Sequence, residues 1–425
     1  MGDERRVVVT GMDLRTPFGN LDETWDALLD GRSSVRRIEG QHERFGELNS
    51  QIASYFDDEM LNAEVLGLNN DSGFRRSCRY LKLSSSAATA LIERSGILDD
   101  EESRHNTGVC ISGGLGGAGD LERAGFHVYN LEKRMNRMKP SLASIVPASA
   151  ASSMIVSRYG FHSGVAPSIE ATCTSGLLSI TYGFDKIMAG RADNYVVGGT
   201  GELSIASFAG FDNLGALSTR NEYPFEASRP FDISRDGFVF GEGAGVLLLE
   251  ELSTVKDKSR ILAEIKGYGE RSDASKDPLK PNPDGKYLIE AMRDAIEDAE
   301  VNSEDIDYIN AHGTSTPLND GIESRAIRKV FGSHADRLSV NAFKSYVGHT
   351  LGASGSIELI LGIKAMNEGI IPPVLNLEKP DLEGGCDLNY VIGSPREIKI
   401  NNFIKNSAGF WGKNLSMVVG RYKDD

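Results

Sequence analysis

The chain has 425 residues, of which 40% are hydrophobic and 25% charged, with a formal net charge of −15. It is longer than one hydrophobic core usually supports, so we expect two domains or two fused halves. The negative charge argues against a general nucleic-acid surface, which should be basic, although a local basic patch can still receive an acidic partner.

The four cysteines form neither a Cys-x-x-Cys pair nor a zinc-like spacing; they are Cys78, Cys110, Cys173 and Cys386. Few, scattered cysteines fit a reducing compartment, so we expect a cytoplasmic protein without a metal site. No stretch approaches the roughly 18 apolar residues that a bilayer-spanning helix requires. The N-terminal apolar run, Val7–Val9, is too short for a signal peptide, and we expect no membrane association.

The first elements alternate between strand and helix. We expect a buried strand over Arg6–Gly11 and helices over Thr24–Leu29 and Leu81–Ser95, with an irregular insertion over residues 38–71. Residues 107–119 run from a short strand into a glycine-rich turn. Its glycine spacing is not the GxGxxG of a dinucleotide fold, so close backbone packing is the better explanation.

The next stretch, Pro167–Ile180, predicts a strand that turns at Thr174-Ser175-Gly176 into a helix, with Cys173 at the turn. At a helix N-terminus the unpaired amide groups and the macrodipole favour an anion, so we expect this thiol to ionise more easily than a free one. The alternative is a buried cysteine that serves as a small hydrophobe. Two later histidine motifs favour the first interpretation.

A strand over Asn194–Gly199 and a turn-rich loop leading into a strand over Arg229–Glu251 complete the first half. Composition changes over Leu252–Arg260, where we place the boundary. The second half alternates strands with helices, the strands being Ile261–Gly267, Tyr308–Ala311 and Leu415–Val419, and the helices Tyr287–Ala299, Gly321–Phe331 and Ser354–Met366. This order predicts an α/β fold with largely parallel sheets, and no sequence repeat relates the halves.

Three late segments carry candidate chemistry. His312 lies in Ile309–Pro317, Lys344 and His349 lie in Phe343–Gly355, and a glycine-containing segment covers residues 406–414. Each histidine follows a strand-like run and has glycine and small residues beside it. Two neutral imidazoles that converge on one thiolate could stabilise an oxyanion or move a proton.

Together these motifs resemble those of a β-ketoacyl–acyl carrier protein synthase, closest to the elongating condensing enzymes of the thiolase superfamily. The resemblance runs from Val7 to Asn414 and rests on Cys173-Thr174-Ser175-Gly176, Arg229-Pro230-Phe231-Asp232, Arg235-Asp236-Gly237-Phe238, His312-Gly313-Thr314, and Lys344 with Gly348-His349. It implies an α/β thiolase fold, five-layered α-β-α-β-α, built from two similar halves. Residues 1–255 would carry the nucleophile and residues 256–425 the two histidine motifs.

The resemblance also implies a mechanism. Cys173 would accept an acyl chain from the phosphopantetheine arm of a carrier protein, and a second carrier would deliver malonyl. His312 and His349 would stabilise the enolate as carbon dioxide leaves, and the carbanion would attack the thioester. The backbone N–H groups of Cys173 and Phe410 would form the oxyanion hole. Lys344 would orient His349.

Further roles follow from the resemblance alone. Thr314 and Thr316 would hydrogen-bond the pantetheine arm, Phe410 would gate the acyl pocket, and Leu115 would line its far end. Plain core packing is the alternative for Phe410 and Leu115. The enzyme would bind no cofactor of its own.

Two departures from the family pattern point to a specialised substrate. The gating loop, usually Phe-Gly-Phe-Gly-Gly, is Ala408–Gly412 here, and Trp411 adds a large ring that we expect to contact substrate. Phe343 replaces a small residue before Lys344. We therefore expect a secondary-metabolite chain, polyketide or polyene. The alternatives are housekeeping fatty acid elongation and the active subunit of a heterodimer with a chain-length partner.

The expected partners are an acyl carrier protein and a second copy of the chain, with a chain-length factor as the alternative to the second copy. Two basic clusters could dock the acidic carrier: Arg75, Arg76, Arg79 and Lys82, and Lys133, Arg134, Arg137 and Lys139. A solvated face is the alternative for each cluster. An inert chain-length partner would lack the cysteine, a thiolase would lack the Lys344 and His349 arrangement, and nothing resembles the peptide groove of a cysteine protease.

Overall fold

The computed structural model describes residues 5–38, 46–62, 77–129, 140–275, 277 and 280–424. Its strands are β1 (Val7–Arg15), β2 (Val35–Arg37), β3 (Ile52–Ser54), β4 (Thr107–Ser112), β5 (Asn194–Gly201), β6 (Phe240–Gly241), β7 (Gly243–Glu251), β8 (Ala263–Ser272), β9 (Tyr308–Asn310), β10 (Ser339–Asn341), β11 (Ile370–Ile371), β12 (Arg396–Glu397), β13 (Asn402–Gly409) and β14 (Lys413–Gly420). Its helices are α1 (Leu21–Leu29), α2 (Asp58–Asn62), α4 (Arg79–Ser95), α5 (Glu101–His105), α6 (Ala118–Tyr129), α7 (Leu142–Ile145), α8 (Ala150–Tyr159), α9 (Ser175–Met188), α10 (Ile205–Asn213), α11 (Lys286–Asp298), α12 (Asn319–Phe331), α13 (Lys344–Val347) and α14 (Ser354–Glu368). Within these ranges, every helix is too short or too polar to cross a bilayer.

Nine strands form one ladder in the order β10-β9-β13-β14-β8-β1-β7-β5-β4. The antiparallel pair β1 and β8 lies inside it. Outward from β1, the pairings with β7, β5 and β4 are antiparallel, antiparallel and parallel. Outward from β8, the pairings with β14, β13 and β9 follow the same order, and β10 adds an edge. The backbone therefore repeats a pattern that the sequence does not display.

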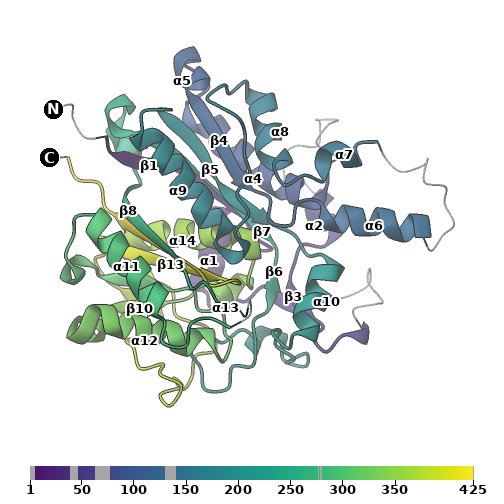
Figure 1. Cartoon of the computed structure of the whole chain (residues 1–425), viewed down its shortest axis with the longest axis vertical. Coiled ribbons are helices and arrows are strands. Elements are labelled where there is room, and N and C mark those ends of the chain that lie inside the picture. Colours follow the sequence, from purple (N-terminus) through teal and green to yellow (C-terminus); the bar gives the residue numbers. More distant parts are fainter. Residues whose placement is uncertain are drawn as a thin grey trace.

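Helices pack against both halves of this ladder, the β1 half and the β8 half (Figure 1). α4 and α8 pack on the strands β1, β7, β5 and β4, while α11 packs on β8 and β14, with α12 beside it. α9 and α14 pack against each other, and α14 contacts both β7 and β13. The layers therefore follow the order helix, sheet, helix, sheet, helix, in which the two sheet layers are the β1 half and the β8 half of the ladder. α14 is apolar nearly all round and buried along its length, as expected of a helix in a central layer.

The expected α/β class is correct, but the expectation of largely parallel sheets is wrong. Of the eight pairings in the described nine-stranded ladder, five are antiparallel and three parallel. One cause is local, because β13 and β14 are joined by residues 410–412 alone, and so short a loop can join only antiparallel neighbours. The periodicity of a strand does not reveal its direction.

Two other expectations also need correction. The backbone before Cys173, over residues 165–171, is not a strand; Cys173 lies in a 3₁₀ turn, Thr172–Thr174, that precedes α9. The segment expected to be an irregular insertion contains β3, which pairs with β2 and β6 in a small sheet, and α2. Residues 39–45 and 63–76 of that region lie outside the described part of the chain.

The glycine-rich turn after β4 is explained by close packing, as expected. A Cβ atom placed on Gly113 would lie 2.6 Å from the carbonyl oxygen of Ala148. One placed on Gly116, whose φ is +59°, would lie 2.4 Å from the carbonyl oxygen of Val146. A larger residue at either position would push the turn away from the segment that precedes α8.

Candidate active site

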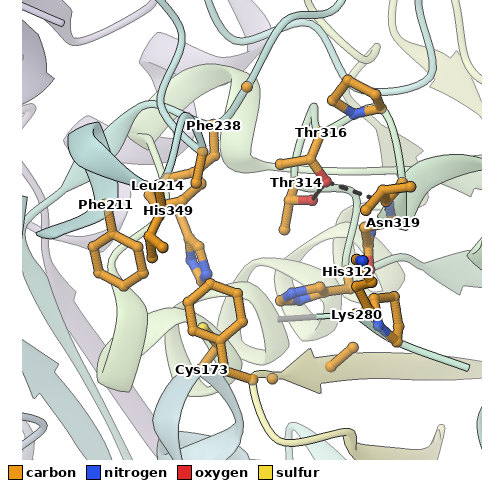
Figure 2. Close-up of a pocket in the computed structure, with 18 of the residues that line it drawn as sticks. Cys173, Phe211, Leu214, Phe238, Lys280, His312, Thr314, Thr316, Asn319 and His349 are labelled. Carbon is orange, nitrogen blue, oxygen red and sulfur yellow. Dashed lines mark hydrogen bonds between the residues drawn. The ribbon is translucent and has the colours of Figure 1, made fainter. Parts of the chain in front are cut away.

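A cavity of about 440 Å³ lies where the loops after several strands meet (Figure 2). Cys173 comes from the first half of the chain, and His312 and His349 come from the second half; all three line the cavity. Two phenylalanines of the first half, Phe211 and Phe238, line it as well. The structure therefore brings together the three side chains that the sequence motifs single out.

The turn that carries Cys173 is held in an uncommon conformation. Thr172 has φ of +55°, in the left-handed region that β-branched residues rarely adopt. The Ser175 hydroxyl donates to the Thr172 carbonyl at 2.6 Å and accepts from the Ala171 N–H at 2.8 Å. The Thr174 hydroxyl donates to the Ala171 carbonyl at 2.7 Å. These hydroxyls form hydrogen bonds with backbone N–H and carbonyl groups of the turn, which lies outside a regular α-helix or strand.

The Cys173 thiol does not ionise easily in this structure, contrary to expectation. Burial raises its pKa to about 11, and the positive charge of Lys344 opposes this shift without cancelling it. Desolvation of the anion outweighs the helix N-terminus, because the side chain is only 8% exposed. At neutral pH the sulfur is a thiol, so its reaction requires a proton acceptor in the cavity.

The two histidine rings lie next to each other, with centroids 5.5 Å apart and planes at 83°. Both are buried, at 4% and 3% exposure for His312 and His349. Burial holds the pKa of each ring well below its usual value, and the nearby Lys344 charge adds to the effect. The rings are therefore neutral at neutral pH, and each has one N–H donor and one lone pair.

His349 is positioned by the first residue of α14. Its Nδ1 lies 2.8 Å from the Ser354 hydroxyl, and the centroid of its ring lies 5.3 Å from that of Phe238 with the two planes at 77°. Its backbone N–H donates to the Val239 carbonyl at 2.7 Å. With Nδ1 engaged, Nε2 is the nitrogen left for a group in the cavity.

Lys344 contacts His312 and not the ring of His349, which corrects the expected pairing. Its ammonium lies 3.3 Å from His312 Nδ1, donates to the His312 carbonyl, and forms an ion pair with Glu358 at 2.7 Å. A lysine ammonium can only donate, so His312 Nδ1 accepts, and the ring proton is on Nε2. His312 thus presents an N–H donor to the cavity.

The backbone around His312 is held from another side by a buried carboxylate. Glu323, on α12, accepts from the N–H groups of His312 and Gly313 at 2.8 and 2.9 Å. Asn406 donates to the same carboxylate at 3.3 Å. The loop that carries His312 is therefore fixed by charged and amide side chains from two other elements.

Sequence motifs do not identify Glu323, Glu358 or Lys405, although all three contact the site. Each is at most 2% exposed. A usable signal exists for two of them, because Glu358 interrupts the apolar run of α14 and Lys405 follows two apolar residues in β13. Charged residues inside apolar runs are rarely buried without a partner.

Thr314 and Thr316 line the cavity together with Leu318, which is 58% exposed. Their hydroxyls are 2.8 Å apart, and the Thr316 hydroxyl accepts from the Asn319 N–H at 3.3 Å (Figure 2). Two adjacent hydroxyls in the lining suit a ligand with polar groups.

The β13–β14 hairpin covers the Cys173 turn. A Cβ atom on Gly409 would lie 2.4 Å from the Thr172 hydroxyl oxygen, so only glycine fits there. The Ser407 hydroxyl donates to the Cys173 carbonyl at 3.2 Å. At the tip, Phe410 lines the cavity, and its ring is 5.5 Å from that of Phe211.

Trp411 and Leu115 are not among the residues that line this cavity. They are 58% and 59% exposed. Trp411 has φ of +66° at the hairpin tip, next to Phe410, which does line the cavity. Leu115 lies in the glycine-rich turn after β4.

The proposed docking clusters lie mostly outside the described residues. This holds for Arg75, Arg76, Lys133, Arg134, Arg137 and Lys139. Arg79 is described, and it forms an ion pair at 2.7 Å with Glu242, which is fully buried. Its charge is matched inside the fold, so it is not the surface cation expected. Lys82, on the next turn of α4, is half-buried.

Residues 4–255 match the family model described as Beta-ketoacyl synthase, N-terminal domain, and residues 262–378 match Beta-ketoacyl synthase, C-terminal domain. The chain is 38% identical to 3-oxoacyl-[acyl-carrier-protein] synthase 2 of Coxiella burnetii, over 99% of this chain and 100% of that one. It is similar to a chain in the structure of a type II polyketide synthase acyl-carrier protein with its ketosynthase bound to the hexaketide, at TM-score 0.85 and 29% identity, covering 99% and 100%. The structure of the ishigamide ketosynthase/chain length factor matches at TM-score 0.86 and 30% identity, also covering 99% and 100%.

Proposed function

The chain belongs to the β-ketoacyl synthase family, and on that basis we propose that it lengthens an acyl chain held on Cys173 by decarboxylative condensation with malonyl on an acyl carrier protein. It is an acyltransferase, and the expected five-layered thiolase fold is confirmed by its layer order and by the solved ketosynthases that it resembles. The proposal rests on one observation: Cys173 shares a cavity with His312 and His349, two neutral imidazoles from the other half of the chain.

The first step transfers the acyl group. The Cys173 sulfur attacks the thioester of the carrier's phosphopantetheine arm, and the bond from the acyl carbon to the pantetheine sulfur breaks. The thiol proton passes through His349 Nε2 to the departing sulfur. His349 is the better acceptor, because Lys344 holds His312 in the tautomer that donates from Nε2. The N–H groups of Cys173 and Phe410 would receive the oxyanion.

The second step makes the carbon–carbon bond. The Nε2–H of His312 donates to the malonyl thioester oxygen, so the electrons released as carbon dioxide leaves are held in an enolate. The enolate carbon attacks the Cys173 thioester, the bond to sulfur breaks, and the thiolate takes up a proton. Lys344 positions His312, and Thr314 and Thr316 would hydrogen-bond the pantetheine amides.

The substrate proposal is narrower: we propose a polyketide or polyene chain. Support comes from two structures that the chain resembles, the type II polyketide ketosynthase bound to a hexaketide and the ishigamide ketosynthase/chain length factor, and from the altered gating loop. Because the Trp411 ring is exposed, its effect would act through the backbone of the loop, which a non-glycine residue holds at φ of +66°. Phe343, fully buried before Lys344, is the second departure.

Several smaller proposals complete the assignment. The halves 1–255 and 256–425 would be the two thiolase-like units, and two copies of the chain would form a homodimer or one copy would pair with a chain-length factor. Arg75, Arg76, Lys82 and Lys139 would contact the carrier. We also propose a cytoplasmic location, in keeping with four free cysteines.

Mass spectrometry of the Cys173 adduct tests both levels of the proposal. The purified chain would be mixed with malonyl carrier and with matched saturated medium-chain and polyenoyl carriers. We expect condensation with both, at least about tenfold faster with the polyenoyl carrier, which is a modest difference in transition-state binding. Equal rates would remove the specialised substrate and leave housekeeping elongation. Activity only after co-expression with a chain-length partner would identify the heterodimer.

A further inference from the structure

Lys405 is a second buried lysine on the carboxylate that Lys344 already contacts. Its ammonium donates to Glu358 Oε2, while that of Lys344 lies 2.7 Å from Glu358 Oε1. None of the three side chains is more than 2% exposed. Burial of a cation is costly, and one lysine already neutralises Glu358. The second lysine therefore needs a reason beyond pairing this carboxylate.

Lys405 also holds the end of β9, the strand that leads to His312. It donates to the Ala311 carbonyl at 3.1 Å and lies 3.4 Å from Asn310 Oδ1. With Glu358, these contacts use all three ammonium protons. Ala311 directly precedes His312, so Lys405 connects the backbone of that histidine to α14.

Other charged and titratable groups surround Lys405. Lys344 on α13 and Glu323 on α12 face it, besides Glu358 on α14, and both histidine rings are within its electrostatic reach. Burial lowers the pKa of Lys405 to about 8, an effect that Glu358 opposes and Lys344 reinforces. The Lys405 charge is itself among the causes of the low pKa of His312 and His349.

We propose that Lys405 is a positioning residue which clamps Glu358 to the strand end at Ala311 and places a second buried positive charge beside His312 and His349. The proposal rests on the condensation proposed above. The two contacts fix the register between β9, β13 and α14. The charge disfavours imidazolium, so both rings keep the neutral form that donation to an enolate and proton transfer require.

Loss of the Lys405 charge should raise the pKa of both imidazole rings. Removal of a nearby positive charge raises the pKa of an imidazole, so protonation of the rings begins at a higher pH. The acid limb of the pH–rate profile should move upward by roughly one unit when Lys405 becomes neutral. A residue that only fills space would change the rate at all pH values and leave that limb in place.

The test compares Lys405→Met with Lys405→Arg, which keeps the charge. Lys364→Met is the matched control, because it removes a lysine of α14 that pairs with Glu368 outside the cavity. The pH–rate profile of condensation is measured for each. Separately, peptide mass spectrometry follows modification of His312 and His349 by diethyl pyrocarbonate against pH, since this reagent attacks the neutral ring.

We expect both midpoints to rise in Lys405→Met and to stay unchanged in Lys405→Arg and Lys364→Met. Unchanged midpoints in Lys405→Met would overturn the proposal. If that variant does not fold, Lys405→Gln, which keeps a donor without the charge, gives the same two outcomes. If the wild-type chain does not condense, but the midpoint of histidine modification is still higher in Lys405→Met than in the wild type, only the proposed function is refuted.

Discussion

The turns before α9 and α14 have the same backbone design but carry different chemistry. Each is a 3₁₀ turn whose first residue has positive φ, Thr172 at +55° and Leu351 at +48°. Each leads into a helix that starts with serine and glycine. In the first turn the second residue is Cys173, and in the second it is Gly352.

The packing explains why the second turn carries no side chain at this position. A Cβ atom on Gly352 would lie 2.9 Å from the Cα atom of Gly114, so only glycine fits. The second half instead provides His349, three residues earlier. The duplicated backbone thus places a thiol in one turn and an imidazole just before the other. The two turns share one backbone conformation and differ in the side chains that they bring to the cavity.

The largest expected effect comes from removing the sulfur. Cys173→Ala should lower the rate of condensation by about 10³-fold or more, because no thioester can form. Radiolabelled malonyl incorporation would measure the loss. Cys110→Ala, a change at a buried cysteine outside the cavity, should keep activity within a few-fold. An active Cys173→Ala protein would contradict the proposed mechanism.

Ser175 and Ser354 are the first residues of α9 and α14, and replacing each should affect a different property of the protein. Ser354→Ala removes the hydrogen bond to His349 Nδ1, and we expect condensation to fall by about 10- to 100-fold. Ser175→Ala leaves the Ala171 N–H unpaired, and we expect a loss of about 1–3 kcal/mol in unfolding free energy. Steady-state kinetics and urea unfolding on both variants would show whether the two losses are distinct. Equal patterns in the two variants would mean that the turns have equivalent roles.

The contact between α9 and α14 should lose stability when a side chain is added at the glycine near the start of either helix, Gly176 or Gly355. A Cβ atom on Gly176 would lie 2.7 Å from the Gly352 carbonyl oxygen, and one on Gly355 would lie 2.7 Å from the Leu177 nitrogen. We expect Gly176→Ala and Gly355→Ala each to cost about 1–3 kcal/mol of stability by overpacking. Gly210→Ala on α10, where a Cβ meets nothing within 4 Å, should be neutral or stabilising by about 0.5 kcal/mol. A stable Gly355→Ala protein would show that the crossing can relax.

The smallest effect should appear as a pH dependence of stability. The folded-state pKa values of His312 and His349 lie well below the ordinary value of 6.5, so the unfolded chain binds more protons in that range. The contribution of the two histidines to the free energy of unfolding should therefore be fully present above about pH 6.5 and decrease as the pH is lowered below that value. Thermal melts between about pH 7.5 and 5 would measure this, and the slope should be smaller in a His312→Gln, His349→Gln double variant.

The sequence identifies the three side chains that meet in the cavity but not the contacts that position them. Cys173, His312 and His349 stand in short glycine-containing motifs, and the resemblance of these motifs to those of a known family is what identifies them. The motifs pair Lys344 with His349, whereas its ammonium contacts His312, because the direction of this long side chain depends on the ion pair with Glu358.

The same limit explains the errors in the fold. Strand direction, the duplicated ladder and the burial of Lys405 follow from segments far apart in the chain. The raised pKa of the Cys173 thiol likewise depends on how completely other elements cover it. Such properties are fixed by packing, which residue pattern alone does not describe.

The exposed hairpin tip gives the protein a built-in optical probe. The chain has two tryptophans, and Trp25 is 4% exposed whereas Trp411 is 58% exposed. A collisional quencher in solution should therefore dim mainly the emission of Trp411. Because Phe410 beside it lines the cavity, the fluorescence of this one exposed ring would report, without an added label, any movement of the hairpin tip when a candidate acyl thioester is mixed with the protein.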